Sequence, residues 1–128
     1  MKSTLTITRL SKIASQKDPA VIVKPKQNTM ATWERKPQER NDQQYFFAGK
    51  FYMTKGVFDA LHFEEIISIY HDVKAFAKQR NGIDYMQVYT DGNGRKLFMI
   101  DQLDTRMIES GEYSEEHNYC TLLLDEEY

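Results

Sequence analysis

Two carboxylates, Asp101 and Asp104, follow a run of four apolar residues in the stretch LFMIDQLD, residues 97–104. At the end of a strand, such side chains can ligate a hard cation or transfer a proton to a reacting group. From Asp101 to the C-terminus the chain has nine acidic residues and one base, Arg106. This composition is just as typical of a strand that runs into a solvated acidic loop. A reactive site and a non-catalytic surface are therefore both open.

The spacing of these acids does not favour a metal site. Mg²⁺ and Ca²⁺ need oxygen ligands that converge from several segments, and these acids match no calcium-loop pattern. Asp91 and His117 are further ligands that the neighbouring sequence offers. We therefore expect no metal and no cofactor, and we assign the acids to a binding surface. The candidate binding residues of this region are Asp101, Asp104, Glu109 and Glu112.

The sequence shows no catalytic constellation elsewhere. The histidines are scattered, and His62 and His71 are nine residues apart, so that they do not share a helical face. Cys120 lies in the apolar context NYCTLLL, which favours a packed thiol over a reactive one. The stretch DGNGR precedes a strand, whereas a phosphate-binding loop precedes a helix. We predict no catalytic residue.

Two tyrosines are the remaining candidates for binding. Tyr85, Gln87 and Tyr89 alternate with Met86 and Val88, and this alternation predicts that the three lie on one face of a strand. That face either lies under the helix or presents tyrosines to a partner, where tyrosine is enriched. We include Tyr85 and Tyr89 among the candidate binding residues.

The elements that must position these residues follow from periodicity. Residues 45–54 alternate as a strand, and residues 64–80 carry one apolar stripe with helical spacing, which Asn81-Gly82 ends. The hairpin signal DGNG, residues 91–94, joins strands at 83–90 and 95–101. A long polar connection covers residues 102–117. The last segment, residues 118–128, fits a strand or a short helix, and Thr121 between apolar residues favours the strand.

This order of elements predicts an α+β domain over residues 41–128: an antiparallel sheet of about four strands, packed by one long amphipathic helix. Residues 1–40 predict a loosely ordered basic arm. The arm contains nine Lys and Arg against three Asp and Glu, whereas residues 41–128 contain eight against sixteen. A basic arm on an acidic body can bind a polyanion or fold back on its own domain. Met30, where the composition changes, is a possible alternative translation start.

Four pieces of the sequence occur together in a recognisable order: NDQ with GKFYMTKGVFDAL, then VKAF, then FMIDQLD, and finally CTLLLDEEY. In this order and spacing the chain resembles the bacterial family known as domain of unknown function 3768, over residues of about 41–128. The resemblance implies a protein of proteobacteria, often encoded beside plasmid and other mobile-element genes, and it implies no activity. The family has two aromatic residues where this chain has Gln102 and Leu103. If those aromatics form a binding platform, this chain lacks it.

The expected function is that of a small accessory protein, of a mobile genetic element, that binds a protein partner through its acidic surface. One alternative is a metal-dependent enzyme acting on a phosphate ester with Asp101 and Asp104 as ligands, and another is a nucleic-acid-binding regulator that uses residues 1–40.

The single cysteine excludes an intramolecular disulfide and favours a reducing compartment. No apolar run has the ~20 residues of a membrane span, and the N-terminus lacks the apolar region of a secretory signal. We expect a cytoplasmic protein without membrane contact.

Overall fold

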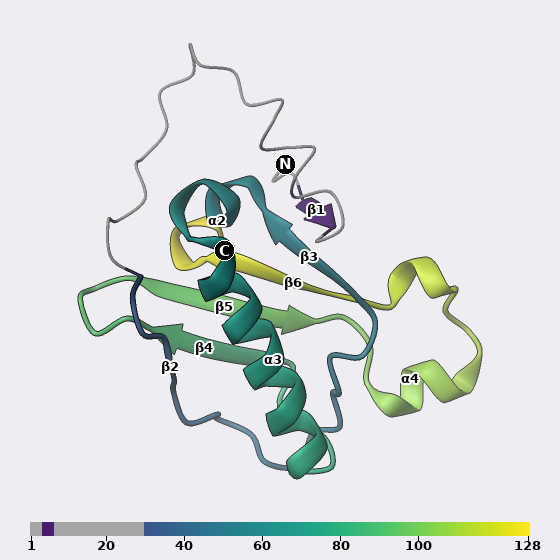
Figure 1. The fold of residues 1–128 in the computed structure, drawn as a ribbon. Coiled ribbons are helices and arrows are strands. Elements are labelled where there is room, and N and C mark those ends of the chain that lie inside the picture. Colours follow the sequence, from purple (N-terminus) through teal and green to yellow (C-terminus); the bar gives the residue numbers. More distant parts are fainter. Residues whose placement is uncertain (1–3, 7–29) are drawn as a thin grey trace.

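The strands of the computed structural model form one sheet in the order β1-β3-β6-β5-β4-β2 (Figure 1). The structure describes residues 4–6 and 30–128, and within them the sheet has six strands. The strands are β1 (Thr4–Thr6), β2 (Glu34–Arg35), β3 (Lys50–Thr54), β4 (Met86–Thr90), β5 (Lys96–Asp101) and β6 (Tyr119–Leu124). The helices are α2 (Lys55–Ala60), α3 (Phe63–Gln79) and α4 (Thr105–Ser110), with 3₁₀ turns η2 (Glu115–His117) and η3 (Asp125–Glu127).

The α+β class is confirmed, but the prediction of a purely antiparallel sheet is wrong. β6 lies between β3 and β5, and it pairs antiparallel with β5 but parallel with β3. The parallel pair arises because α3 carries the chain across the sheet after β3, so that β4 starts again in the direction of β3 (Figure 1). Alternation within a strand does not specify its neighbours, and the mixed arrangement was therefore not visible in the sequence.

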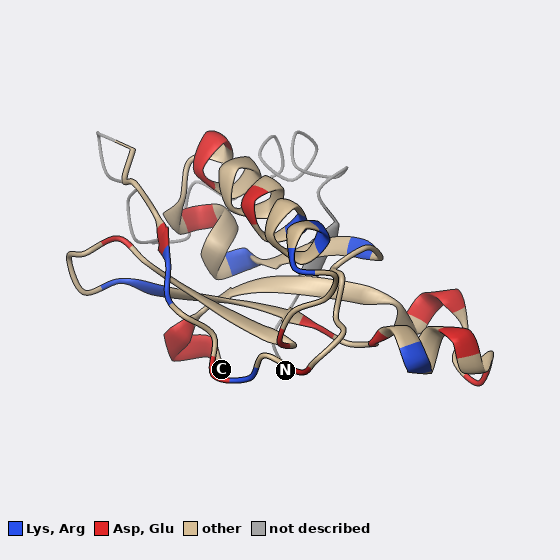
Figure 2. Ribbon diagram, turned by 90° about the horizontal axis from the view of Figure 1, so that it is seen from below, with Lys and Arg blue, Asp and Glu red and all other residues tan. Residues whose placement is uncertain are grey.

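The core lies between α3 and one face of the sheet. The apolar stripe of α3 buries Ile66, Ile69, Val73 and Ala77, as its spacing predicts. Helix α3 ends at the predicted position, where Asn81 and Gly82 both have positive φ. The sheet residues buried against it include Phe51, Met53, Leu97, Met99, Cys120 and Leu122. In Figure 2, α2 and α3 both lie on this side of the sheet.

The predicted hairpin is confirmed in its register. Val88 is paired with Phe98, and Asp91 holds the turn by accepting hydrogen bonds from the backbone N–H groups of Asn93 and Arg95. The C-terminal segment forms the strand β6, which was the favoured alternative. The connection over residues 102–117 is more regular than its polar sequence suggested, since it contains α4 and η2.

Parts of the predicted arm form the two edges of the sheet. β1 pairs with β3, and β2 pairs with β4. The buried carboxylate of Glu65 anchors the segment before β2: its Oε2 accepts hydrogen bonds from the backbone N–H of Ala31 and from Nε1 of Trp33. Residues 30–40 therefore pack on the domain, while the rest of the predicted arm, apart from β1, lies outside the described residues.

Candidate functional site

Asp101, the first of the two aspartates, is buried at the end of β5 with 4% of its surface exposed. Its Oδ2 accepts a hydrogen bond of 2.9 Å from the backbone N–H of Phe47, and its Oδ1 accepts one of 3.0 Å from Gln102. Burial raises the pKa of the carboxyl group to about 6, against the opposing effect of the two N–H donors. Asp101 is therefore a buried acceptor that links the segment before β3 to the end of β5.

Asp104, the second aspartate, begins helix α4. Its Oδ1 accepts a hydrogen bond of 2.9 Å from the backbone N–H of Met107, as an N-cap residue does. The next residue, Thr105, donates both its N–H and its hydroxyl to the carbonyl oxygen of Gln44. Asp104 thus caps its own helix, while Thr105 joins the start of α4 to the segment that precedes β3.

The described residues do not gather these acids into a cation site. Within residues 4–6 and 30–128, no three His, Cys, Asp or Glu side chains are placed to share a metal ion. Asp101 and Asp104 instead direct their carboxylates at backbone N–H groups of different segments. In this structure both carboxylates accept hydrogen bonds from backbone N–H groups.

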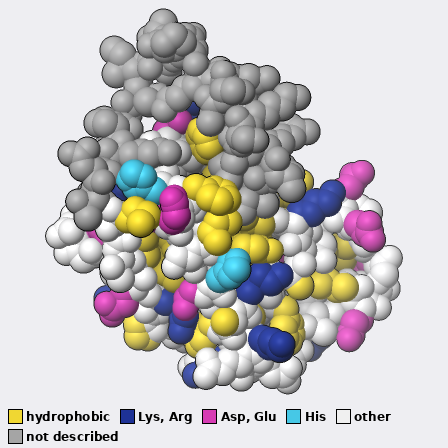
Figure 3. Space-filling view, in the orientation of Figure 1, with side chains coloured by type: hydrophobic (Ala, Val, Ile, Leu, Met, Phe, Trp, Pro, Cys, Tyr) yellow, Lys and Arg dark blue, Asp and Glu magenta, His cyan; other side chains and the backbone are white. Residues whose placement is uncertain are grey.

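Residues 105–117, between β5 and β6, form a projection that we call the acidic excursion. It projects beyond the end of the sheet (Figure 1). Figure 2 shows its acidic positions close together on the ribbon at one edge of the molecule, and Figure 3 shows acidic side chains along that edge. Every residue from Ile108 to His117 is exposed. The four glutamates form no ion pair within the described part of the chain; they are Glu109, Glu112, Glu115 and Glu116.

The excursion also exposes apolar surface. Ile108 is 45% exposed and Tyr113 is 43% exposed. The excursion is held internally: Gly111 ends α4 at a φ of 73°, and the Ser114 hydroxyl lies 2.9 Å from Nδ1 of His117. The candidate residues Glu109 and Glu112 thus lie on an ordered surface that combines negative charge with apolar side chains.

The two candidate tyrosines do not share a face, contrary to the prediction from alternation. Tyr89 is 1% exposed beneath α3, and its hydroxyl donates a 2.7 Å hydrogen bond to Asp72. Tyr85 precedes β4 and is exposed, with its ring near that of Tyr45. Alternation fails at Tyr85 because the residue lies before the regular strand begins. Tyr89 belongs to the core, and only Tyr85 remains accessible to a partner.

The structure also places the groups with possible nucleophilic or acid–base chemistry. Cys120 is buried in β6, and burial raises the pKa of its thiol to about 12, so that the thiolate is not populated near neutral pH.

The sequence was not interpreted as burying Glu65, although the position of this residue indicated it. It falls in line with Ile69 and Val73 on the apolar stripe, and an acid at a stripe position indicates a buried partner.

Comparison with known proteins adds no relative. No protein-family model, curated protein or solved structure matches the chain. Two segments that are distant in the sequence, MTKGV (residues 53–57) and DEEY (residues 125–128), meet in the fold. The Thr54 hydroxyl donates to Oε1 of Glu127 at 2.6 Å, and a Cβ on Gly56 would come within 2.5 Å of Oε2 of the same residue. These contacts pack the start of α2 against the C-terminal turn η3.

Proposed function

We propose that the protein is a non-enzymatic accessory protein that binds a basic protein partner through the acidic excursion. The observation that carries this proposal is the unbroken exposure of residues 108–117, with four glutamates that lack ion-pair partners in the described part of the chain. Unpaired glutamates make the local electrostatic potential strongly negative, and such a potential accelerates the encounter with a positively charged surface.

The exposed Ile108 and Tyr113 supply the short-range part of this interaction. Charge alone gives a weak and salt-sensitive contact, since exposed ion pairs contribute about 0–1 kcal/mol each. Aromatic and aliphatic side chains that become desolvated carry most of the affinity in protein interfaces. The partner we expect therefore presents Lys or Arg side chains around an apolar patch.

In this proposal Asp101 and Asp104 have a supporting role. Asp101 fixes the start of the connection, and Asp104 starts helix α4, so that the glutamates are presented from an ordered base.

The resemblance to a family of mobile-element proteins supports the accessory role, and a cytoplasmic location belongs to the same proposal. Among the described residues, no helix is long and apolar enough to cross a membrane. The metal-dependent alternative has no observation in its favour, because both aspartates are engaged by backbone N–H groups.

The test is affinity capture from the native host, followed by binding measurements with the purified partner. One variant replaces the four excursion glutamates with glutamine. The matched control replaces four exposed glutamates elsewhere, namely Glu34, Glu39, Glu64 and Glu126. We expect the excursion variant to lose at least tenfold in affinity at low salt, and the control variant to bind within about twofold of the wild type, because the lost charges lie outside the interface. Equal losses in both variants, or no specific protein partner, would refute the proposal.

A further inference from the structure

The sheet has a second face, opposite α2 and α3, which we call the open face. In Figure 2 this side of the sheet carries η3 and neither α2 nor α3. Alternation and register place residues of five strands on it, including Glu34 of β2, which pairs with Thr90. The open face consists of Glu34, Lys50, Tyr52, Met86, Val88, Thr90, Lys96, Phe98, Ile100, Tyr119, Thr121 and Leu123.

The centre of the open face is largely apolar, whereas a solvated antiparallel sheet face is usually polar. Two rows of paired side chains cross it from strand to strand, and all of them except Leu123 are partly exposed. The ring of the C-terminal Tyr128, which is 66% exposed, lies against Phe98 and adds to this surface. A contiguous apolar patch of this kind indicates an interaction surface. One row is Tyr52, Thr121, Ile100 and Met86, and the next is Leu123, Phe98 and Val88.

Charged residues surround this centre, and on the side of β3 and β6 their sign changes along the strands. Lys50 begins β3, beside the start of β6. Because these two strands are parallel, η3 follows β6 at the opposite end, where Asp125 and Glu126 are exposed. Lys96 lies beside these acids, one residue beyond the last pair of β5 and β6. This side of the face is therefore positive at the start of β3 and negative overall at the end of β6.

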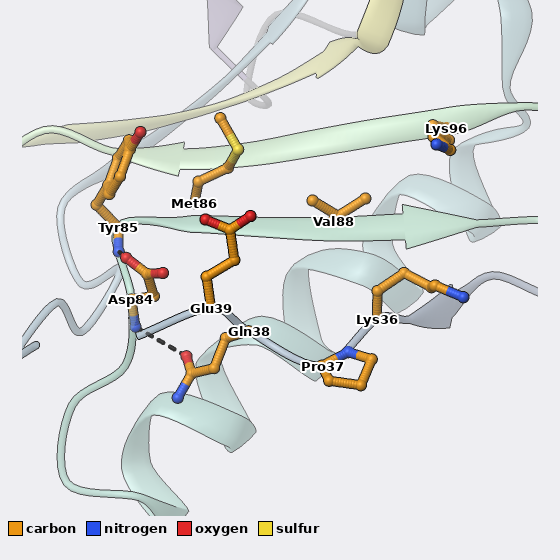
Figure 4. Close-up of a pocket in the computed structure, with 9 residues that line it drawn as sticks. All are labelled: Lys36, Pro37, Gln38, Glu39, Asp84, Tyr85, Met86, Val88 and Lys96. Atoms are coloured by element: carbon orange, nitrogen blue, oxygen red, sulfur yellow. Dashed lines mark hydrogen bonds between the residues drawn. The ribbon is translucent and has the colours of Figure 1, made fainter. Parts of the chain in front are cut away.

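On the side of β4 and β2 the sign changes in the opposite direction. A hollow of about 250 Å³ lies there, and Figure 4 shows Glu39 and Asp84 toward one end of it and Lys36 and Lys96 toward the other. The end with the acids is level with Lys50, since β4 runs in the same direction as β3 and Asp84 precedes β4. The two ends of the face thus carry opposite patterns of charge.

These charges disfavour an occupant of a single sign. A polyanion would meet Glu34 and the acids of η3 beside Lys36 and Lys96, whereas a basic protein would meet Lys50. A second copy of the chain carries both signs in the reversed order that the face requires. Like charges that are brought together oppose association, so charge complementarity favours a second copy.

A two-fold axis that lies in the interface, perpendicular to the strands, turns each end of the face onto the opposite end of the second copy. Lys50 of one copy then meets the acids of η3 of the other. Lys36 meets Glu39, and the facing hollows leave room for these two long side chains. Glu34 meets the turn that contains Arg40. Each of these charges therefore meets one of opposite sign.

The apolar rows match in the same arrangement. With the axis between the two rows, Ile100 packs on Phe98 of the second copy, and Met86 packs on Val88. The strands of the two sheets then run along nearly the same line, as in the aligned packing of two sheets. An axis along the strands would instead bring the two acidic excursions together at one end of the dimer, where their glutamates repel. The perpendicular axis places them at opposite ends.

The area of the face limits the strength of this contact. At about 4.8 Å between strands and about 3.3 Å per residue, the strands from β3 to β2 span about 24 by 18 Å. Two such faces bury on the order of 1,000 Å², which is the lower limit for a specific interface. The expected dimer is therefore weak, and its population depends on concentration.

We propose that two copies of the chain associate through their open faces, as a two-fold dimer whose axis is perpendicular to the strands. The apolar rows form the centre of the interface, and the contacts of Lys50 with η3 and of Lys36 with Glu39 form its polar rim. The acidic excursion projects beyond the sheet, so the dimer presents two excursions. This inference is independent of the proposed function, because the face dimerises whether or not the excursion binds a protein.

Sedimentation velocity of the full chain measures the dimer between about 5 μM and about 1 mM, a range that covers weak association. The first variant, Thr121→Lys, places a charge in the centre of the face, where dimerisation would bury it without a partner. Its matched control, Ser68→Lys, adds the same charge at an exposed position of α3, on the other side of the sheet. Circular dichroism confirms that each variant is folded.

A second set of variants exchanges charges at exposed positions, where substitution affects folding least. Lys50→Glu brings like charges together in the dimer. A triple variant, in which Asp125→Lys and Glu126→Lys are added to Lys50→Glu, brings unlike charges together again. Restored dimerisation in the triple variant is specific to a contact between Lys50 and η3 of two copies.

We expect Thr121→Lys to weaken dimerisation by about tenfold or more, and Ser68→Lys to dimerise as the wild type does. Lys50→Glu should weaken it by about threefold or more at low salt, and the triple variant should return to within about twofold of the wild type. The proposal is overturned if the chain is a monomer at every concentration, or if Thr121→Lys dimerises as well as Ser68→Lys, since another surface then forms the dimer. It is equally overturned if the triple variant dimerises no better than Lys50→Glu.

Discussion

The backbone N–H of Phe47 donates to Oδ2 of Asp101 at 2.9 Å, although the two residues are 54 positions apart. At this contact Phe47 has a φ of 54°, a conformation that residues other than glycine rarely adopt. The ring of Phe47 is fully buried in the core, so the backbone is held from both sides. One buried carboxylate thus connects the entrance of β3 to the exit of β5, where the acidic excursion begins.

The first prediction concerns the pH dependence of this contact. Because the folded-state pKa of Asp101 is raised to about 6, the folded protein binds this proton more tightly than the unfolded chain. The stability contributed by protonated Asp101 is therefore present below about pH 4 and is lost as the pH rises to about 6. With Asp101→Asn the loss disappears, so the unfolding free energy of the variant relative to the wild type should rise by up to about 3 kcal/mol between pH 4 and pH 7.

Denaturant unfolding of both proteins across this pH range measures the difference. Asp42→Asn is the matched control, because Asp42 is exposed and its replacement removes the same charge. A stability difference between the wild type and Asp101→Asn that stays constant with pH would show that the carboxyl group titrates normally.

The second prediction concerns Asp104 and the order of the excursion. Asp104→Ala removes the hydrogen bond to the Met107 N–H and should cost about 1 kcal/mol, the usual value for a lost N-cap. The effect should be local, since α4 has no buried residue. Hydrogen exchange of the Ile108 and Gly111 amides should accelerate several-fold, while exchange in β5 stays unchanged. Ser114→Ala, in the next turn, should leave the exchange of α4 as in the wild type; an effect of equal size there would contradict a specific cap.

The third prediction concerns the close approach of Gly49 to the chain before β6. A Cβ at Gly49 would lie 2.2 Å from the carbonyl oxygen of Asn118, a backbone atom that cannot rotate away. Gly49→Ala should therefore destabilise the protein by more than about 2 kcal/mol, as overpacking against fixed atoms does. Gly92→Ala in the hairpin turn is the control: it meets no atom within 4 Å, and its positive φ alone should cost about 1 kcal/mol. Equal losses of stability in Gly49→Ala and Gly92→Ala, measured by thermal unfolding, would show that the segment around Asn118 moves to make room for the added methyl group.

The fourth prediction uses Trp33, the single tryptophan of the chain, as a reporter of residues 30–36. Its indole N–H donates to the buried Glu65, and Arg95 stacks over its ring at 4.8 Å. Glu65→Ala leaves the N–H groups of Ala31, Trp33 and His62 without this acceptor, so the segment should detach and become hydrated. Trp33 emission should shift to longer wavelength and acrylamide quenching should increase, whereas Glu64→Ala, at an exposed neighbour, should change neither. Unchanged emission in Glu65→Ala would show that the segment is held by its pairing with β4 instead.

The local elements of this protein were readable in its sequence. The α3 stripe of Ile66, Ile69 and Val73, its stop at Asn81-Gly82 and the DGNG hairpin follow from periodicity and backbone conformation. These signals lie within a few residues of one another, so one stretch of chain contains all the information. The same holds for the acidity and polarity of residues 105–117, which indicated an exposed surface before its helix was visible.

Tertiary structure decided the roles of the candidate residues. Asp101 and Asp104 look alike in sequence, yet one is a buried clamp and the other a helix cap, because their N–H partners come from different segments. Tyr85 and Tyr89 were separated by a strand that begins one residue after Tyr85. Tyr119 lies beside Tyr52 only because β6 is placed between β3 and β5. Such pairings depend on contacts between distant residues, and local periodicity carries no information about them.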